Sequence, residues 1–195
     1  MSNTTIILQL LMIGISLGGV YALMGSGLTI IFGVMRIVNI AHAILMMVAS
    51  YITYFAFVNF GLDPILSIFV TMPLMYLLGV VVYKLFFSKI SKDARYGELT
   101  VLLTFSIALI FEGTLGYLFT NTYRTTSPGY ATSSFLFGDL YLPKGQAYAT
   151  LLSLVLILLL WAFLQYSRLG NAIRATMQNP TAAQVVGVNT EKASV

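Results

Sequence analysis

The stretch LLSLVLILLLWAF, residues 151–163, decides the fold of this chain. It contains no charged residue, and its apolar side chains do not alternate with polar ones as they do in the strands of a membrane barrel. A backbone exposed to lipid must satisfy its own hydrogen bonds, and a helix does so within a single segment. The stretch therefore predicts a membrane-spanning helix.

The composition of the whole chain agrees with this prediction. Of its 195 residues, 58% are hydrophobic and only 8% are charged, whereas soluble domains carry about 25% charged residues. Ten basic and six acidic side chains cannot cover a surface that faces water. The absence of cysteine excludes disulfides, thiolate metal sites and thiol catalysis. No basic cluster is interleaved with aromatic residues, so we expect no nucleic-acid partner.

A span requires about 20 apolar residues, and five windows of the sequence meet that length. They are residues 6–32, 37–60, 64–83, 99–123 and 147–166. The first is over-long and rich in glycine, which favours either close helix packing or a break near residues 25–27 into two shorter helices. We therefore predict an all-α, polytopic transmembrane bundle with about five to six spans.

The basic residues of the loops indicate the orientation. The loop after the third window carries Lys84, Lys89, Lys92 and Arg95, and Arg168 and Arg174 follow the fifth. Two spans separate these groups, so both lie on one side, which the positive-inside rule makes cytoplasmic. The side of the N-terminus stays open, because the first window crosses either once or twice.

The segment between the last two windows, residues 121–146, is predicted to be external. It is rich in Ser, Thr and Tyr, and its Pro128–Gly129 pair suits a turn in which the glycine adopts positive φ. Loops of this length are often functional. Docking of an external partner and a solvated lid with strand character are both open interpretations.

The polar tail RLGNAIRATMQNPTAAQVVGVN, residues 168–189, follows directly. Leu169, Ile173 and Met177 share one helical face. The pair Asn179–Pro180 is a start signal for a second helix, and Gly187 suits its end. Two helices of about 8 residues reach only about 12 Å each and cannot span. They either lie in the headgroup region or form a knob for a cytoplasmic partner.

The tail resembles the cytoplasmic coupling loop of ABC-importer permeases, the segment that docks in a cleft of the ATPase subunit. More narrowly, it is similar to the permeases for branched-chain amino acids, in the LivH-like subclass. The pattern G-x-x-x-R-A-x-x-x-N-P-x-A-A-x-x-x-G-[IV]-N is matched by Gly170, Arg174, Ala175, Asn179, Pro180, Ala182, Ala183, Gly187, Val188 and Asn189. By this resemblance these residues up to Gly187, together with Arg168, contact the ATPase.

A second block, YALMGSGLTIIFGVMRIVNIAHA at residues 21–43, resembles an early segment of the same family. Arg36, Asn39, Ala41 and His42 match its polar core, while Ala43 stands where the family usually has glycine. The resemblance divides the chain into a permease domain, residues 1–167, and a coupling segment, residues 168–195. Members of the family continue with further spans, so we expect those spans to be missing here.

Four polar residues fall in or beside the windows. Arg36, Asn39 and His42, at i, i+3 and i+6, are predicted to lie near one helical face as a structural hydrogen-bond cluster, although a substrate contact by His42 is an alternative. Glu112 lies midway through the fourth window, where it pairs with polar groups, lines the pathway or carries a proton. One histidine without companion ligands does not predict a metal site.

The resemblance implies a permease subunit of an ATP-driven importer in a bacterial or archaeal plasma membrane. It would translocate branched-chain or related small amino acids, with an amide or urea-like solute as the alternative substrate. The implied partners are ABC ATPase subunits, an identical or paralogous second permease, an extracytoplasmic solute-binding protein and membrane lipid.

The sequence contains no Walker A loop, so ATP and Mg²⁺ are expected on a separate ATPase, with no cofactor on this chain. We expect no catalytic residues, because one histidine and no cysteine cannot readily form a catalytic group. Two rival functions remain open: a secondary transporter with Glu112 and His42 as its proton relay, and a structural membrane subunit of a larger complex.

Overall fold

The computed structural model describes residues 3–90, 95–120, 122–185 and 187. Within them, five helices are long and apolar enough to cross a membrane: Asn3–Met35, His42–Phe60, Ile68–Ile90, Tyr96–Phe119 and Lys144–Tyr166. They correspond one by one to the five predicted windows, which confirms the polytopic helical fold. The chain forms two compact units, Met1–Gly27 with Ser127–Ser167 and Leu28–Thr126 with Arg168–Val195.

The first helix, α1 (Asn3–Met35), is continuous over 33 residues. At 1.5 Å per residue it is about 50 Å long, which exceeds the hydrocarbon thickness of about 30 Å. The alternative of a break near residues 25–27 is therefore wrong, because the glycines there are accommodated within regular helix.

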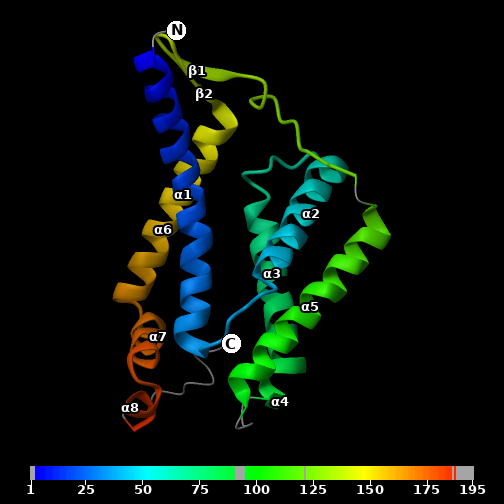
Figure 1. Ribbon diagram of the computed structural model, residues 1–195, viewed down its shortest axis with the longest axis vertical. Helices are drawn as coiled ribbons and strands as arrows, with labels where there is room; N and C mark the ends of the chain where they lie inside the picture. Colours follow the sequence, from blue (N-terminus) through cyan, green and yellow to red (C-terminus); the bar gives the residue numbers. More distant parts are fainter. Residues whose placement is uncertain (1–2, 91–94, 121, 186, 188–195) are drawn as a thin grey trace. The chain divides into compact units, whose positions relative to one another are not determined.

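The first unit joins the early turns of α1 to α6 (Lys144–Tyr166), and the two helices lie side by side (Figure 1). Gln146 Nε2 donates to the backbone oxygen of Ile13 at 3.1 Å, and Thr150 Oγ1 donates to that of Ser16 at 3.0 Å. A Cβ added at Gly19 would lie 3.4 Å from Thr150 Cγ2. Close helix packing at small residues, the other prediction for this region, is thus present at Gly19.

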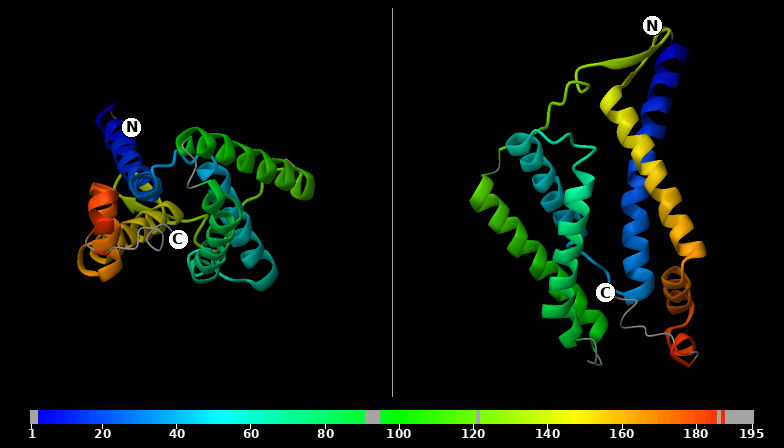
Figure 2. Two further views of the ribbon diagram at one scale, coloured as in Figure 1. Left: turned by 90° about the horizontal axis from the view of Figure 1, so that it is seen from below. Right: turned by 180° about the vertical axis from the view of Figure 1, so that it is seen from behind.

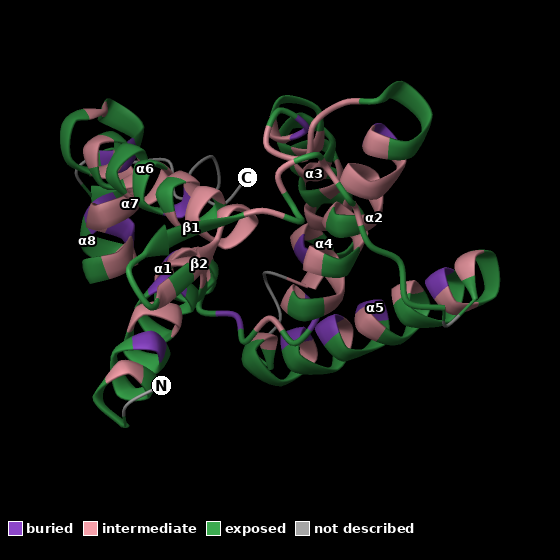
Figure 3. Ribbon diagram, turned by 90° about the horizontal axis from the view of Figure 1, so that it is seen from above, coloured by how far each residue is buried: buried purple, intermediate pink, exposed green. Residues whose placement is uncertain are grey.

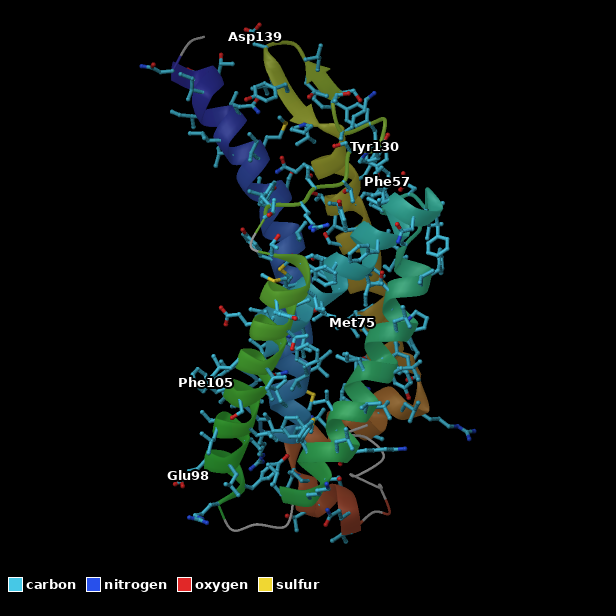
Figure 4. The ribbon with its side chains drawn as sticks, turned by 90° about the vertical axis from the view of Figure 1, so that its right-hand side faces the viewer. Phe57, Met75, Glu98, Phe105, Tyr130 and Asp139 are labelled. Carbon is cyan, nitrogen blue, oxygen red and sulfur yellow. The ribbon has the colours of Figure 1, made fainter. Side chains whose placement is uncertain are left out.

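A β-hairpin precedes α6 in the same unit. Strand β1 (Ser134–Phe137) pairs antiparallel with β2 (Leu140–Pro143). Gly138 opens the two-residue turn with φ +64°, and Asp139 stands at its tip (Figure 4). This hairpin confirms the strand character predicted for the segment.

Two hydrogen bonds tie the hairpin to α1. Gln9 Nε2 donates to the backbone oxygen of Tyr141 at 2.6 Å, and Tyr141 N donates to Gln9 Oε1 at 3.0 Å. Gln9 is only 7% exposed. One amide side chain thereby satisfies both backbone groups of Tyr141, as a neighbouring strand would.

The turn at Pro128 differs from its prediction in one respect. Ala131 N donates to Pro128 O at 2.8 Å, so the turn itself is present. Gly129, however, is not among the residues with positive φ, and the expectation for it was wrong. The chain turns here with ordinary backbone angles, and the positive φ of this segment falls on Gly138 in the hairpin instead.

In the second unit, α2 (His42–Phe60) packs against both α3 (Ile68–Val82) and α5 (Tyr96–Phe119) (Figure 2). Helix α3 continues through a π-helical turn, Tyr83–Phe87, into α4 (Ser88–Ile90).

Three hydroxyl groups join α2 to the start of α3. Thr53 Oγ1 lies 3.2 Å from Thr71 Oγ1, and Ser67 Oγ lies 3.3 Å from Thr53 Oγ1. Ser67 Oγ also lies within donating distance, 2.6 Å, of Pro64 O. The contact between these two helices is therefore held partly by polar groups, as in other membrane bundles.

The core of the second unit is small. Within the described residues, its hydrophobic cluster consists of the buried residues Ile37, Ala41, Phe87 and Ile107. In each of the five spanning windows at most 17% of the residues are buried, and exposed or half-buried surface dominates every helix (Figure 3). Soluble proteins rarely expose apolar surface on this scale, which is consistent with a protein that lies in lipid.

Candidate functional site

The chain turns between α1 and α2 over residues 36–41, and the polar residues of the early motif lie at this corner. Arg36 adopts a left-handed conformation with φ 53°, which is uncommon for a residue with a side chain. Its backbone N–H still donates to Phe32 O at 2.9 Å. His42 N donates to Asn39 O at 3.3 Å as α2 begins. The corner is therefore a turn that separates two helices.

The prediction that Arg36, Asn39 and His42 share one helical face is wrong, because residues 36–41 are not helical. Arg36 is exposed, whereas the other two are half-buried. Asn39 Oδ1 and His42 Nε2 are buried and form no hydrogen bond within the described residues. A hydrogen-bond cluster of these three side chains is thus not formed in that part of the chain, and their role in a pathway stays a prediction.

Thr104 of α5 holds the corner in place from outside the motif. It is 1% exposed, and its hydroxyl lies 3.4 Å from Ile40 N, which donates to it, and 3.2 Å from Val38 O, to which it can donate. Ile37 and Ala41, each 1% exposed, flank these residues and belong to the hydrophobic cluster. The non-helical backbone of the corner is therefore partly satisfied by a side chain from another span.

The polar tail forms α7 (Arg168–Gln178) and α8 (Pro180–Val185), which confirms the predicted pair of helices. Asn179 Oδ1 accepts hydrogen bonds from Thr181 N and Ala182 N, both at 3.1 Å, so the predicted N-cap is also confirmed. Gly187 adopts φ +83°, as a C-terminal glycine does. Val188 and Asn189 of the motif lie outside the described residues.

The residues predicted to contact an ATPase differ in accessibility. The exposed ones are Arg168, Asn179, Ala182 and Gly187, the half-buried ones are Arg174, Ala175 and Pro180, and the buried ones are Gly170 and Ala183. Arg174 Nη2 donates to Asn171 Oδ1 at 2.7 Å, on the same helix. The motif thus combines accessible positions with positions that pack inside the unit.

The apolar face of α7 is anchored to the last turns of α1. A Cβ added at Gly33 would overlap with Met177 Cε and would lie 3.1 Å from its Cγ and 3.3 Å from its Sδ. Leu169, on the same predicted face, is 60% exposed. The contact is therefore concentrated at Met177, the end of α7 that adjoins α8.

Glu112 of α5 is exposed and lines a cavity of about 510 Å³. The cavity lies within the second unit, between α2, α5 and the residues Thr120, Thr122, Tyr123 and Arg124. Glu112 forms no hydrogen bond or ion pair with the other described residues, so the structural pairing expected for it is not seen there. Its predicted roles in lining a pathway and in carrying a proton stay predictions.

Several residues of these sites escaped the sequence analysis. Arg124, which lines the same cavity, and Thr104, which contacts the corner, are not singled out by any sequence pattern. A signal for the cavity was available, because Glu112 and Gly116 have the i, i+4 spacing that places residues on one helical face. No sequence signal paired Gly33 with Met177, because their contact joins distant segments.

Comparison with known proteins connects these features. A family model described as the permease component of branched-chain amino acid transport systems matches residues 10–195. No solved structure gives a significant match.

Curated relatives include a probable branched-chain amino acid permease LivH of Methanocaldococcus jannaschii, 27% identical over 87% of this chain and 55% of its own length. The high-affinity permease BraD of Pseudomonas aeruginosa is 25% identical over 93% of this chain and 62% of its own. LivH of Escherichia coli is 23% identical over 95% of this chain and 63% of its own. The chain thus spans between 55% and 63% of the length of these relatives.

Proposed function

The chain belongs to the permease family of branched-chain amino acid transport systems, and on that premise we propose that it is a permease subunit of an ATP-driven importer. The proposed substrate is a branched-chain or related small amino acid that an extracytoplasmic binding protein delivers. ATP and Mg²⁺ bind to separate ATPase subunits, because this sequence has no phosphate-binding loop of its own. A second permease subunit, identical or paralogous, completes the membrane pathway.

The observation that carries this proposal is the α7–α8 pair. With 11 and 6 residues, the helices are far too short to span, at about 17 Å and 9 Å. Ala182 is exposed while its neighbour Ala183 is 3% exposed. One side of α8 therefore packs on the chain itself, and the other is available to a partner.

The five spans support an orientation for the proposed importer. If the basic end of α3 and the start of α7 are cytoplasmic, five crossings place the N-terminus on the outer side of a plasma membrane. The hairpin between α5 and α6 is then external. Its tip exposes Leu136 (76%) and Phe137 (60%), which we propose as a contact for the binding protein.

Movement of the ATPase would reach the membrane through the contact between Met177 and Gly33. The ATPase would hold α7 and α8 in different positions with and without bound ATP. This difference would shift the equilibrium between two conformations of the permease. Gly33 lies three residues before Arg36, where the corner begins. A shift of α7 would therefore act directly on the joint between α1 and α2.

Neighbouring alanines allow a direct test. Ala182→Trp should reduce the ATPase that co-purifies with the chain, and ATP-driven leucine uptake, at least tenfold, because an exposed indole blocks docking. Ala131→Trp, at another exposed alanine, in the segment predicted to be external, is the control and should retain both. Ala183→Trp should instead lower expression and thermal stability, since that position is buried.

The rival functions give different outcomes in the same experiment. Uptake that follows a proton gradient and persists in Ala182→Trp would favour the secondary transporter. A chain that co-purifies with a membrane complex but never with a nucleotide-hydrolysing subunit would favour the structural role. Either result would overturn the importer proposal.

A further inference from the structure

The cavity beside Glu112 is built from two facing helical surfaces. Helix α2 contributes Met47, Ser50, Tyr51 and Tyr54, which are spaced i, i+3, i+4 and i+7. Helix α5 contributes Glu112, Leu115 and Gly116 at i, i+3 and i+4, and Phe119 continues the same face at i+7. The volume of about 510 Å³ falls in the range of about 300–1,000 Å³ typical of small-molecule sites.

Aromatic rings pack beside the cavity-lining residue Tyr51. Tyr51 stacks on Phe119 with ring centroids 4.6 Å apart and an interplanar angle of 22°. Phe55 lies 5.1 Å from Phe119 in a tilted arrangement. These ring contacts join α2 to α5 next to the cavity, so an aromatic surface adjoins it.

Arg124 brings a positive charge to the same wall. Its Cζ lies 5.6 Å from the Tyr54 ring centroid and 5.9 Å from that of Phe119, within the range of a cation–π contact. Its Nη2 donates to the backbone oxygen of Phe119 at 3.2 Å. A guanidinium has five N–H donors in a fork that matches a carboxylate, so this positioned group retains donors for a ligand.

Glu112 and Arg124 line one cavity with opposite charges but do not pair with each other. Within the described residues neither forms an ion pair. An ionised carboxylate within a span is costly unless a partner compensates it. The cavity therefore presents one carboxyl group and one guanidinium beside aromatic rings, and a ligand that carries groups of opposite charge could pair with both.

We propose that this cavity binds a free α-amino acid zwitterion with an apolar side chain. The ligand ammonium group pairs with Glu112, its carboxylate with Arg124, and its side chain packs on the rings of Tyr51 and Tyr54. The assignment rests on the proposed function, because it makes the cavity a binding site for the transported amino acid within the permease.

Three ligands that share the leucine side chain but differ in their charged groups test this arrangement. The full chain with its co-purifying subunits, in nanodiscs without nucleotide, would be assayed by competition against radiolabelled leucine. Leucinamide lacks the carboxylate and 4-methylpentanoate lacks the ammonium group. We expect the wild type to bind leucine at least tenfold more tightly than either analogue.

Each charge variant should remove one preference only. Glu112→Gln should lower the affinity for leucine at least tenfold, to that of 4-methylpentanoate. The affinity for 4-methylpentanoate itself should not change. Arg124→Gln should lower the affinity for leucine to that of leucinamide. The affinity for leucinamide itself should not change. Glu98→Gln and Arg95→Gln, at the other end of α5, are the matched controls and should retain the wild-type ratios.

Unchanged ratios in both Glu112→Gln and Arg124→Gln would overturn the proposal, as would a wild type that binds none of the three ligands. If the charge variants do not fold, Ser50→Leu decides, because it fills the cavity without changing a charge. Retained leucine binding in folded Ser50→Leu overturns the proposal. ATP-driven uptake is measured separately. If uptake is absent while the ligand preferences are intact, the result contradicts only the importer proposal.

Discussion

Met177 of α7 occupies the space beside Gly33 of α1 that a side chain at position 33 would need. A motif near the end of the chain is thereby in contact with the helix at its beginning. The methionine is long and flexible, so it fills the irregular gap over a bare backbone. The glycine belongs to the early family motif and the methionine lies within the late one, and only the fold brings them together.

Enlarging Gly33 should separate these two helices. Gly33→Leu overpacks the contact, at a cost of about 1–3 kcal/mol, and should lower both thermal stability in detergent and ATP-driven uptake. Met177→Ala in the same chain should restore part of both, because it vacates the space. Gly14→Leu is the control, since a Cβ at Gly14 meets nothing within 4 Å. Equal losses in the Gly33 and Gly14 variants would contradict the contact.

Removing the hydroxyl of Thr104 should loosen the corner between α1 and α2. Thr104→Val leaves Ile40 N–H and Val38 O without their side-chain partner, at a cost of about 1–3 kcal/mol. Chemical unfolding in detergent measures the change. Thr104→Ser keeps the hydroxyl and should lose less stability; if both variants lose the same amount, the methyl group and not the hydrogen bonds holds the corner.

The side chain of Gln9 should control the order of the external hairpin. Gln9→Leu removes both bonds to Tyr141 and should speed amide exchange at Tyr141 and proteolysis at the hairpin. Gln9→Glu keeps an acceptor for Tyr141 N but loses the donor, so an intermediate effect is expected. Exchange rates that match the wild type in both variants would show that α6 alone positions the hairpin.

Asn179 should act mainly as a helix cap. Asn179→Ala removes the acceptor for Thr181 N and Ala182 N, which costs about 0.5–2 kcal/mol, and should reduce ATPase co-purification because α8 frays. Asn179→Asp retains both bonds and should retain the ATPase. Loss of the ATPase in Asn179→Asp as well would mean that the amide itself contacts the partner.

Local signals predicted most of the elements. The five windows found the five spans, since apolar length is a property of one segment. Asn179 and Gly187 were identified because capping involves only neighbouring residues. The same local reasoning gave a wrong prediction at Arg36, because it assumed helical spacing through residues that form a turn. Apolar sequence alone does not show where a helix ends if neither proline nor a charge run stops it.

The sequence by itself determined that the chain is a bundle of apolar helices followed by a capped polar pair, because these properties depend on composition and on contacts within a few residues. It also identified the family, through two ordered motifs. Only the tertiary structure decided that Thr104 supports the corner, that Met177 covers Gly33, and that Glu112 and Arg124 line one cavity. Each of these contacts joins positions on separate elements, and their distance in space depends on how the helices pack.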